Sequence, residues 1–297
     1  MDDAKPESAT SRGVVAGAHG SDALKFGDLT ERKKHRSDPY AIFLPNRVVS
    51  STTMRLIIVV EVAFALLVWF NSPYEILPKP AEVFHALGKL WTKDGLGQEL
   101  ITSFLMNVEA LSWSALISLV LAYLTVLPVC RPIVVAISKG RFLSMIGFST
   151  VFTIMVGGGH HLKTALLVYG ITVFFVTSMA SVIANIPKSQ FDHARTLRMS
   201  EWRVVWEVVV LGTADKAFEV LRQNAAMGWM MLAMVEGIVK SEGGVGVLLL
   251  AQDKYIHLAE VFAIQIVILI VGLGQDAVIG VVRRLVCPYA DLTLERK

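Results

Sequence analysis

Six long runs of apolar residues, separated by shorter polar stretches, dominate the pattern of this sequence. Crossing about 30 Å of hydrocarbon takes about 17–25 helical residues, and the runs approach or reach this length. The third run is the weakest, because Lys139, Gly140 and Arg141 interrupt it. The pattern predicts an all-α, polytopic membrane protein with about six transmembrane helices, at residues 54–70, 104–128, 133–156, 164–186, 217–238 and 258–282.

The composition agrees with a membrane protein. Hydrophobic residues make up 54% of the 297 residues, charged residues 18%, and the mean hydropathy is +0.57, which is outside the usual range of soluble domains. A net charge of +3 gives no indication of a nucleic-acid partner. The transmembrane domain is predicted over 54–286, between a polar, largely disordered tail at 1–53 and a short tail at 287–297.

The distribution of Lys and Arg predicts the orientation, because cytoplasmic loops are enriched in these residues. The loops around 129–141 and 188–216 and both ends of the chain are rich in them, whereas residues 71–103 balance Lys79, Lys89 and Lys93 against four acids. Both termini and the loop at 188–216 are therefore expected in the cytoplasm.

The polar segment "KSQFDHARTLRMSEWRVVWEVVV", residues 188–210, predicts two short helices. The first starts just after Pro187, where Ser189 and Asp192 have the spacing of a capping box. The second starts at Ser200 and Glu201, since a carboxylate is favourable at a helix N-terminus. Its apolar positions, Trp202, Val205, Val208 and Val209, share one face by helical spacing. Periodicity alone leaves open whether this face lies on lipid headgroups or against a partner protein.

Three stretches carry a resemblance to a known family. "DHARTLRMSEWRVVWEVVVL" resembles the cytoplasmic coupling loop of ABC importer permeases, and "LPKPAEVF" resembles their Leu-Pro-x-Pro-x-Glu-Val segment. "GWMMLAMVEGIVKSEGGVGVLL" resembles their fifth helix and the Gly-x-Gly turn after it. The resemblance runs from about Leu77 to Arg284 and is greatest to the branch that handles nitrate, taurine, alkyl sulfonates and bicarbonate.

The resemblance implies a MetI-like permease bundle in the bacterial cytoplasmic (inner) membrane, with both termini cytoplasmic and without catalytic residues of its own. ATP would be bound and hydrolysed by a dimer of ABC ATPase subunits. A second permease subunit, identical or different, and a periplasmic or lipid-anchored solute-binding protein would complete the importer. The solute would be a small molecule, such as an inorganic anion, a sulfonate or taurine.

The resemblance also assigns the coupling loop to residues 188–211 and its contacts with the ATPase to seven residues: Asp192, His193, Ala194, Arg198, Ser200, Trp202 and Leu211. Several positions depart from the family pattern. Asp192 replaces a Glu, His193 an Ala, and Arg198 a Gly. Because a left-handed residue between two helices favours Gly, Arg198 predicts either a different turn or a strained one. These departures leave a second hypothesis open, that of a degenerate permease homologue with a structural or regulatory role beside an intact permease.

Four residues near the fifth predicted span are candidates for helix packing or for the translocation path: Trp229, Glu236, Gly244 and Gly246. For Glu236 packing is favoured, because an ionised carboxylate would repel an anionic solute. Asp276 is interpreted in the same way, and so are the methionines of this span, Met227, Met230, Met231 and Met234.

The stretch "GGGHHLKT", residues 157–164, departs from a phosphate-binding loop, because Leu162 stands where glycine precedes the lysine and no strand comes before it. The neighbouring His160 and His161 are expected in a solvated turn, since no third metal ligand is close in sequence. A stand-alone secondary transporter is disfavoured by the lack of an inverted repeat. A membrane enzyme is disfavoured by the lack of a clustered nucleophile, base or metal set.

Overall fold

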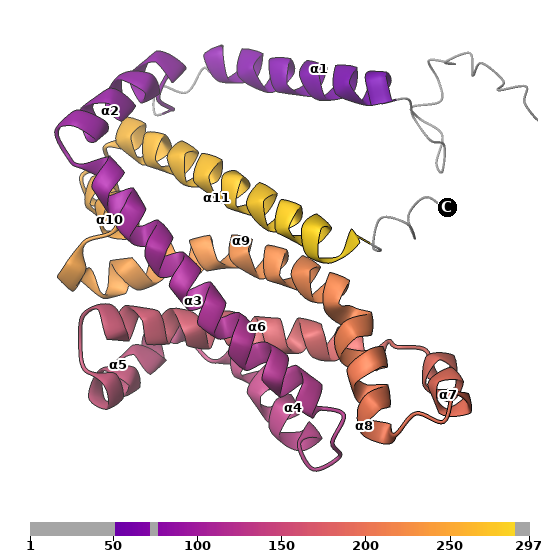
Figure 1. The fold of residues 1–297 in the computed structure, drawn as a ribbon. Helices are drawn as coiled ribbons and strands as arrows, with labels where there is room; N and C mark the ends of the chain where they lie inside the picture. The colour runs from indigo at the N-terminus through magenta and orange to yellow at the C-terminus, as the bar shows by residue number, and fades with distance from the viewer. Residues whose placement is uncertain (1–50, 72–76, 289–297) are drawn as a thin grey trace, which may run out of the picture. The chain divides into compact units, whose positions relative to one another are not determined.

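The computed structural model describes residues 51–71 and 77–288, and this part of the chain contains helices and no strands. The predicted tails therefore lie almost wholly outside the described residues. The chain divides into two compact units, residues 1–64 and 65–297. The helices are α1 (Ser51–Phe70), α2 (Pro80–Thr92), α3 (Leu96–Leu124), α4 (Arg131–Lys139), α5 (Met145–Val156), α6 (His160–Ala184), α7 (Lys188–Thr196), α8 (Glu201–Val204), α9 (Ala214–Ile238), α10 (Val245–Lys254) and α11 (Leu258–Val286), as Figure 1 shows.

Short turns of other helical types join some of these helices. 3-10 turns cover Gly140–Phe142, Leu211–Thr213 and Lys240–Glu242, and a π-helical turn covers Val205–Val210. The chain from α8 to α9 is therefore helical throughout, although its hydrogen-bonding pattern changes three times.

Four helices are long and apolar enough to cross a membrane: Thr52–Phe70, Leu96–Leu124, His160–Ala184 and Leu258–Val286. They coincide with the first, second, fourth and sixth predicted spans. The chain is thus an all-helical, membrane-embedded protein with several membrane-spanning helices.

The third predicted span is not a straight helix. The helical segments Arg131–Phe142 and Met145–Val156 meet at 115°, because Leu143 and Ser144 have extended backbone. The charged interruption recognised in the sequence lies at this bend, where the Tyr169 hydroxyl donates a hydrogen bond to the Gly140 carbonyl over 3.2 Å. This pair counts as a fifth span only if the bent segments cross the membrane together.

The fifth predicted span forms α9 but falls short of the hydropathy of a membrane-crossing helix. The reason lies in its first half, where Glu219 and Arg222 are followed by Gln223 and Asn224. Glu219 and Arg222 form ion pairs with Arg283 and Asp276 of α11, whereas the Asn224 amide donates to the Val220 carbonyl of α9 itself. Polar contacts with α11 thus accompany the low hydropathy of this helix.

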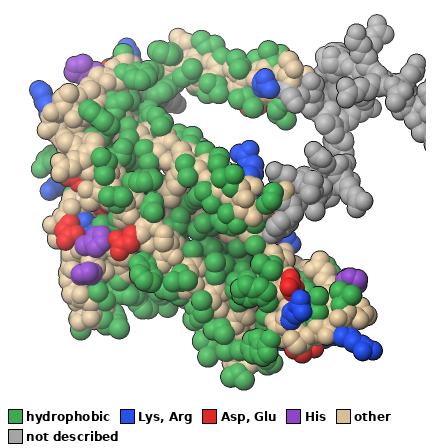
Figure 2. All heavy atoms as spheres, in the orientation of Figure 1, with side chains coloured by type: hydrophobic (Ala, Val, Ile, Leu, Met, Phe, Trp, Pro, Cys, Tyr) green, Lys and Arg blue, Asp and Glu red, His purple; other side chains and the backbone are tan. Residues whose placement is uncertain are grey.

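Three clusters of buried apolar residues hold residues 65–288 together. The largest joins α3, α6 and α9 through residues such as Met106, Leu166 and Leu232. A second cluster joins α2, α10 and α11. A third joins the C-terminal ends of α3 and α6 to the start of α9 through Ala122, Met179 and Val220. On the face drawn in Figure 2, hydrophobic side chains cover the middle of the helices, and charged and histidine side chains gather towards their ends.

Small polar residues let α3 lie close to α6. Ser114 and Ser118 of α3 are buried and donate hydrogen bonds to the carbonyls of Val168 (3.2 Å) and Thr172 (3.4 Å). Small side chains permit close approach of helices in membranes, and a hydroxyl that bonds to a facing backbone carbonyl is satisfied without water. This contact places the starts of α3 and α6 at the same end of the protein.

Candidate functional site

The segment predicted as a coupling loop lies between the end of α6 and the start of α9. It contains α7 and α8, which Figure 1 shows as short helices at one end of the ribbon. Both predicted helix starts are confirmed, with Pro187 and Ser200 as N-caps. The capping box predicted for Ser189 and Asp192 is wrong, because α7 begins at Lys188 and forms no side-chain hydrogen bond at its cap.

Arg198 has left-handed backbone, with φ of 55°. The N–H of Arg198 donates to the carbonyl of Arg195 (2.9 Å), and the N–H of Met199 donates to that of Ala194 (3.4 Å). This pair of bonds defines a Schellman motif, in which the left-handed position is usually glycine. Of the two sequence hypotheses for this position, the strained turn is therefore the one that the structure contains. The strain of an L-residue here is about 1 kcal/mol.

The turn is braced by an ion pair across the two helices. Arg195 donates to both carboxylate oxygens of Glu201, from Nε over 3.2 Å and from Nη2 over 3.3 Å. Asp192 lies 3.9 Å from the same guanidinium. The hydrogen bonds and the charge of Glu201 raise the pKa of Arg195. Because these side chains are exposed, the pair contributes little to stability and mainly orients α8 relative to α7.

Apolar residues of this segment divide between a buried and an exposed set. Ala194, Val204 and Val209 are buried, whereas Trp202 and Trp206 are 72% and 58% exposed. The prediction that Trp202 shares one apolar face with Val209 is wrong, because the π-helical turn at 205–210 changes the residue spacing that the prediction assumed. The segment therefore presents two tryptophans outward rather than inward.

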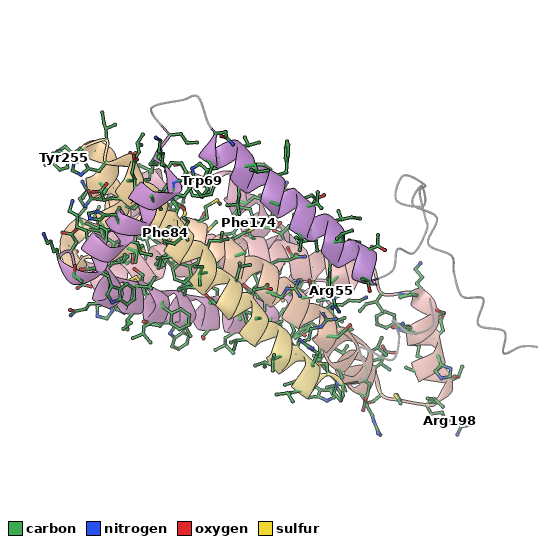
Figure 3. All side chains as sticks on the ribbon, turned by 90° about the horizontal axis from the view of Figure 1, so that it is seen from above. Arg55, Trp69, Phe84, Phe174, Arg198 and Tyr255 are labelled. Atoms are coloured by element: carbon green, nitrogen blue, oxygen red, sulfur yellow. The ribbon has the colours of Figure 1, made fainter. Side chains whose placement is uncertain are left out.

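The remaining loop candidates also lie at the surface of this segment. Asp192, His193, Arg198 and Ser200 are exposed, and Leu211 is 46% exposed. Figure 3 labels Arg198, which points away from the helices at the end of the molecule. Among residues 51–71 and 77–288, Arg198 has no carboxylate within ion-pair distance.

Glu236 lies at the other end of α9 and is fully buried. One carboxylate oxygen accepts a hydrogen bond from the Ser103 hydroxyl (2.6 Å), and the other accepts from the backbone N–H of Gly246 (2.7 Å). Both oxygens are thus occupied by groups of the chain itself. This geometry supports a packing role for Glu236, which links α3, α9 and the start of α10.

The same cluster contains Lys163 and Glu99, which sequence reasoning did not single out. Lys163 of α6 is fully buried and donates a hydrogen bond of 2.8 Å to the Gly243 carbonyl, and Glu99 of α3 accepts one from the N–H of Gly244. A lysine within one turn of a predicted span was the available signal, because a charge there needs a partner. We call Glu99, Ser103, Lys163, Glu236 and the turn 243–246 the α10 polar cluster.

The two candidate glycines shape this cluster. Gly244 has φ of 112°, and a Cβ there would collide with the Glu236 carboxylate. A Cβ at Gly246 would lie 2.8 Å from Cα of Ala233, closer than van der Waals contact allows. Glycine is therefore required at both positions, at the first for backbone conformation and space and at the second for space alone.

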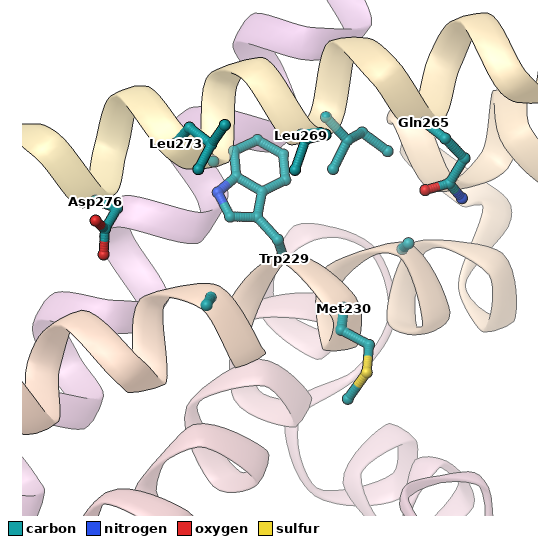
Figure 4. Close-up of a pocket in the computed structure, with 10 residues that line it drawn as sticks. Trp229, Met230, Gln265, Leu269, Leu273 and Asp276 are labelled. Atoms are coloured by element: carbon teal, nitrogen blue, oxygen red, sulfur yellow. The ribbon is translucent and has the colours of Figure 1, made fainter. Parts of the chain in front are cut away.

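Trp229 is buried and lines a groove between α9 and α11. Its indole N–H donates to Oε1 of Gln275 over 2.7 Å, and the Asn107 amide donates to the same oxygen over 3.1 Å. In Figure 4 the indole reaches from α9 towards α11, between Leu269 and Leu273. The groove has a volume of about 650 Å³ and is mostly apolar, with Asp276 and Gln265 as polar residues at its wall.

The expected core packing of the α9 methionines is only partly correct. Met231 is buried, but Met227, Met230 and Met234 are between 40% and 70% exposed. Asp276, by contrast, has the packing contact expected of it, because the Nε of Arg222 lies 2.9 Å from its carboxylate. Glu219 pairs with Arg283 over 3.1 Å, so that two ion pairs join α9 and α11.

His160 and His161 do not lie in a turn, since α6 begins at His160. The Nε2 of His160 is 3.0 Å from a Glu109 carboxylate oxygen. Within residues 51–71 and 77–288, no three His, Cys, Asp or Glu side chains are grouped as metal ligands. Lys163, the lysine of the glycine-rich stretch, points into the α10 polar cluster. These contacts give the stretch a structural role.

Fold and site together define a polytopic helical membrane protein with a helical loop at one end and a buried polar cluster at the other. The chain matches no protein-family model, and no curated protein matches it at a significant level. The functional assignment accordingly depends on the residues and contacts described above.

Proposed function

We propose that this chain is the membrane-spanning permease subunit of an ATP-driven ABC importer in the bacterial cytoplasmic membrane. Its solute is a small molecule, with nitrate, taurine or an alkyl sulfonate as the first candidates on the resemblance of the sequence. The observation that carries the proposal is the α7–α8 element, in which two short helices meet at a left-handed residue. Trp202 of α8 and Trp206 of the π-helical turn after it are exposed. A docking groove on an ATPase would accommodate such a projecting helical pair.

The connections of this element suit the transmission of force. α7 follows α6 after three residues, and α8 continues through helical turns into α9. Both α6 and α9 contribute buried residues to the largest core cluster. A movement of α7 and α8 imposed by an ATPase would therefore be passed to two packed helices, as alternating access requires.

Site-specific photo-crosslinking tests this function. A photoreactive amino acid at position 202 or 206, introduced into the full-length chain in its own host, is expected to crosslink to a protein with ABC ATPase activity. Trp113, which is 53% exposed on the membrane-crossing helix α3, is the matched control position and should not give this product. The purified complex should hydrolyse ATP and support ATP-dependent uptake of a labelled solute in proteoliposomes. Uptake by the chain alone, driven without ATP, would contradict the proposal.

Arg198 favours a second candidate, a degenerate permease homologue that assembles beside an intact permease. A strained, exposed arginine stands where a relaxed glycine would fit, and an unpaired cation forced into an interface is costly. Arg198→Gly separates the two functions. Better ATPase coupling in the variant indicates a handicapped homologue, whereas weaker assembly indicates an arginine matched by an acid of its partner.

A further inference from the structure

The exposed part of α2 is divided into an apolar and a polar sector. One side of the helix is buried through Pro80, Val83, Ala86 and Leu90, and the last three share a core cluster with residues of α10 and α11. Next to this side, Phe84 and Trp91 lie about two helical turns apart on nearly the same line, and they are 73% and 57% exposed. The polar sector comes next around the helix and contains Glu82, His85, Lys89 and Thr92.

α2 lies level with the ends of membrane-crossing helices. α3 begins at Leu96, four residues after α2 ends, and Leu90 and Leu96 belong to the same core cluster. Lys89 forms a 3.1 Å ion pair with Glu260 in the first turn of α11. The indole N–H of Trp69, one residue before α1 ends, donates to the Pro78 carbonyl over 3.0 Å. The ends of three candidate spans thus converge on this short helix.

A further exposed aromatic residue lies near the start of α11. This residue is Tyr255, which is 67% exposed and lies three residues before α11 begins. Figure 3 shows Trp69, Phe84 and Tyr255 towards the end of the molecule opposite Arg198. Aromatic side chains concentrate where membrane meets water, because their rings suit the headgroup level.

We infer that α2 is an interfacial helix whose apolar sector, Phe84 and Trp91, lies in the lipid at the membrane boundary while its polar sector faces water. The partner is the lipid bilayer surface itself. Tyr255 and the flanking Lys79 and Lys93 lie at the same boundary, where lysine ammonium groups reach headgroup phosphates. The helix thereby fixes the depth at which α3 and α11 enter the membrane. This inference stands whether or not the chain transports a solute.

Lipid fits the apolar sector better than a protein partner does. Two large side chains on a single helical line offer far less than the roughly 800 Å² per partner of a stable protein interface. An amphipathic helix that borders water and hydrocarbon needs only a narrow apolar strip, with the polar strip beside it. Around α2, the side buried in the protein is followed by the apolar sector and then by the polar sector. A helix that borders protein, lipid and water in turn requires this order.

Nitroxide scanning of adjacent positions tests the inference in the full-length chain. Single cysteines are introduced as Phe84→Cys, His85→Cys, Trp91→Cys and Thr92→Cys in a background in which both native cysteines, Cys130 and Cys287, are replaced by serine. Each variant is spin-labelled and reconstituted in phosphatidylcholine and phosphatidylglycerol vesicles. Each apolar position is thus matched with its polar neighbour in sequence. Accessibility to oxygen, which partitions into lipid, is compared with accessibility to a water-soluble nickel chelate.

The oxygen-to-nickel accessibility ratio should be several-fold higher at 84 than at 85, and at 91 than at 92. Equal ratios dominated by the nickel chelate at all four positions would show that α2 stands in water and would overturn the inference. Immobile labels at 84 and 91 that neither reagent reaches would overturn it too, because they would show that a protein covers this sector. Thermal unfolding of each labelled variant in detergent identifies any variant that is misfolded. A misfolded variant is replaced by Phe84→Leu or Trp91→Phe with a spin label at Gly88→Cys, and the accessibility of that label to oxygen is then measured.

Discussion

The Glu236 carboxylate accepts a hydrogen bond of 2.7 Å from the backbone N–H of Gly246, in the first turn of α10. The two preceding N–H groups are also bound by side chains, that of Gly244 by Glu99 and that of Val245 by the Ser103 hydroxyl at 2.9 Å. A helix begins with N–H groups that have no partner within the helix, and its dipole favours negative charge there. Side chains from α3 and α9 thus cap α10 and fix its position.

Glu236→Gln should destabilise the protein without removing a solute contact. A glutamine retains one acceptor oxygen but brings an NH₂ group against the Gly246 N–H or the Ser103 hydroxyl, and a buried unsatisfied donor costs about 1–3 kcal/mol. Thermal unfolding in detergent should show a lower midpoint and a smaller yield of assembled complex. Glu207→Gln, at an exposed carboxylate, is the control and should leave the midpoint unchanged. A large change in apparent solute affinity at normal yield would contradict the packing role.

Gly244→Ala should be much more damaging than an alanine at an unconstrained glycine. The left-handed backbone at φ of 112° costs an alanine about 1–3 kcal/mol, and overlap with the Glu236 carboxylate adds a similar amount. Gly147→Ala in α5 meets no atom within 4 Å and should be neutral or stabilising by about 0.5–1 kcal/mol. Unfolding midpoints measured side by side test this contrast, and equal midpoints for the two variants would refute it.

Arg198→Gly should stabilise the α7–α8 turn by about 1 kcal/mol, because glycine adopts the left-handed conformation without strain. Arg203→Gly, at an exposed arginine within α8, removes the same charge but should destabilise by about 0.5–1 kcal/mol. Proteolysis of the 188–211 segment in the folded protein is a suitable measurement, since protection should rise in the first variant and fall in the second. Faster cleavage of the Arg198→Gly variant would show that the arginine side chain itself stabilises the turn.

Cysteine labelling in intact cells should distinguish the two ends of the protein that lie on opposite sides of the membrane. The starts of α3 and α6 meet at the α10 polar cluster, whereas the α7–α8 element follows the far end of α6. Together with the Lys and Arg distribution, this arrangement predicts that a membrane-impermeant maleimide labels Asp94→Cys and His161→Cys but labels Ser200→Cys only after the cells are opened. The three positions are exposed, and Cys130→Ser removes a half-buried thiol from the background. Labelling of position 200 alone in intact cells would reverse the orientation.

Much of the helical pattern could be predicted from the sequence. Four of the six predicted spans are helices long and apolar enough to cross a membrane, because hydropathy over about 20 residues is a local property. The helix starts after Pro187 and at Ser200 were also predictable, since a cap depends on a few neighbouring residues. The bend at Leu143 and Ser144 lies next to a visible interruption, but its angle of 115° depends on packing against α6.

The positions of most helices, and the unusual residue between α7 and α8, follow from the sequence, because propensity, hydropathy and turn chemistry act over short distances along the chain. The meeting of Lys163, Glu99 and Ser103 around the turn at 243–246 becomes visible only in the folded protein, since these contacts join residues between 80 and 145 positions apart. The same holds for the exposure of Trp202 and the burial of Val204 and Val209, because the π-helical turn alters the residue spacing. Burial of a polar side chain depends on which partner the fold brings within hydrogen-bonding distance, and no local pattern contains that information.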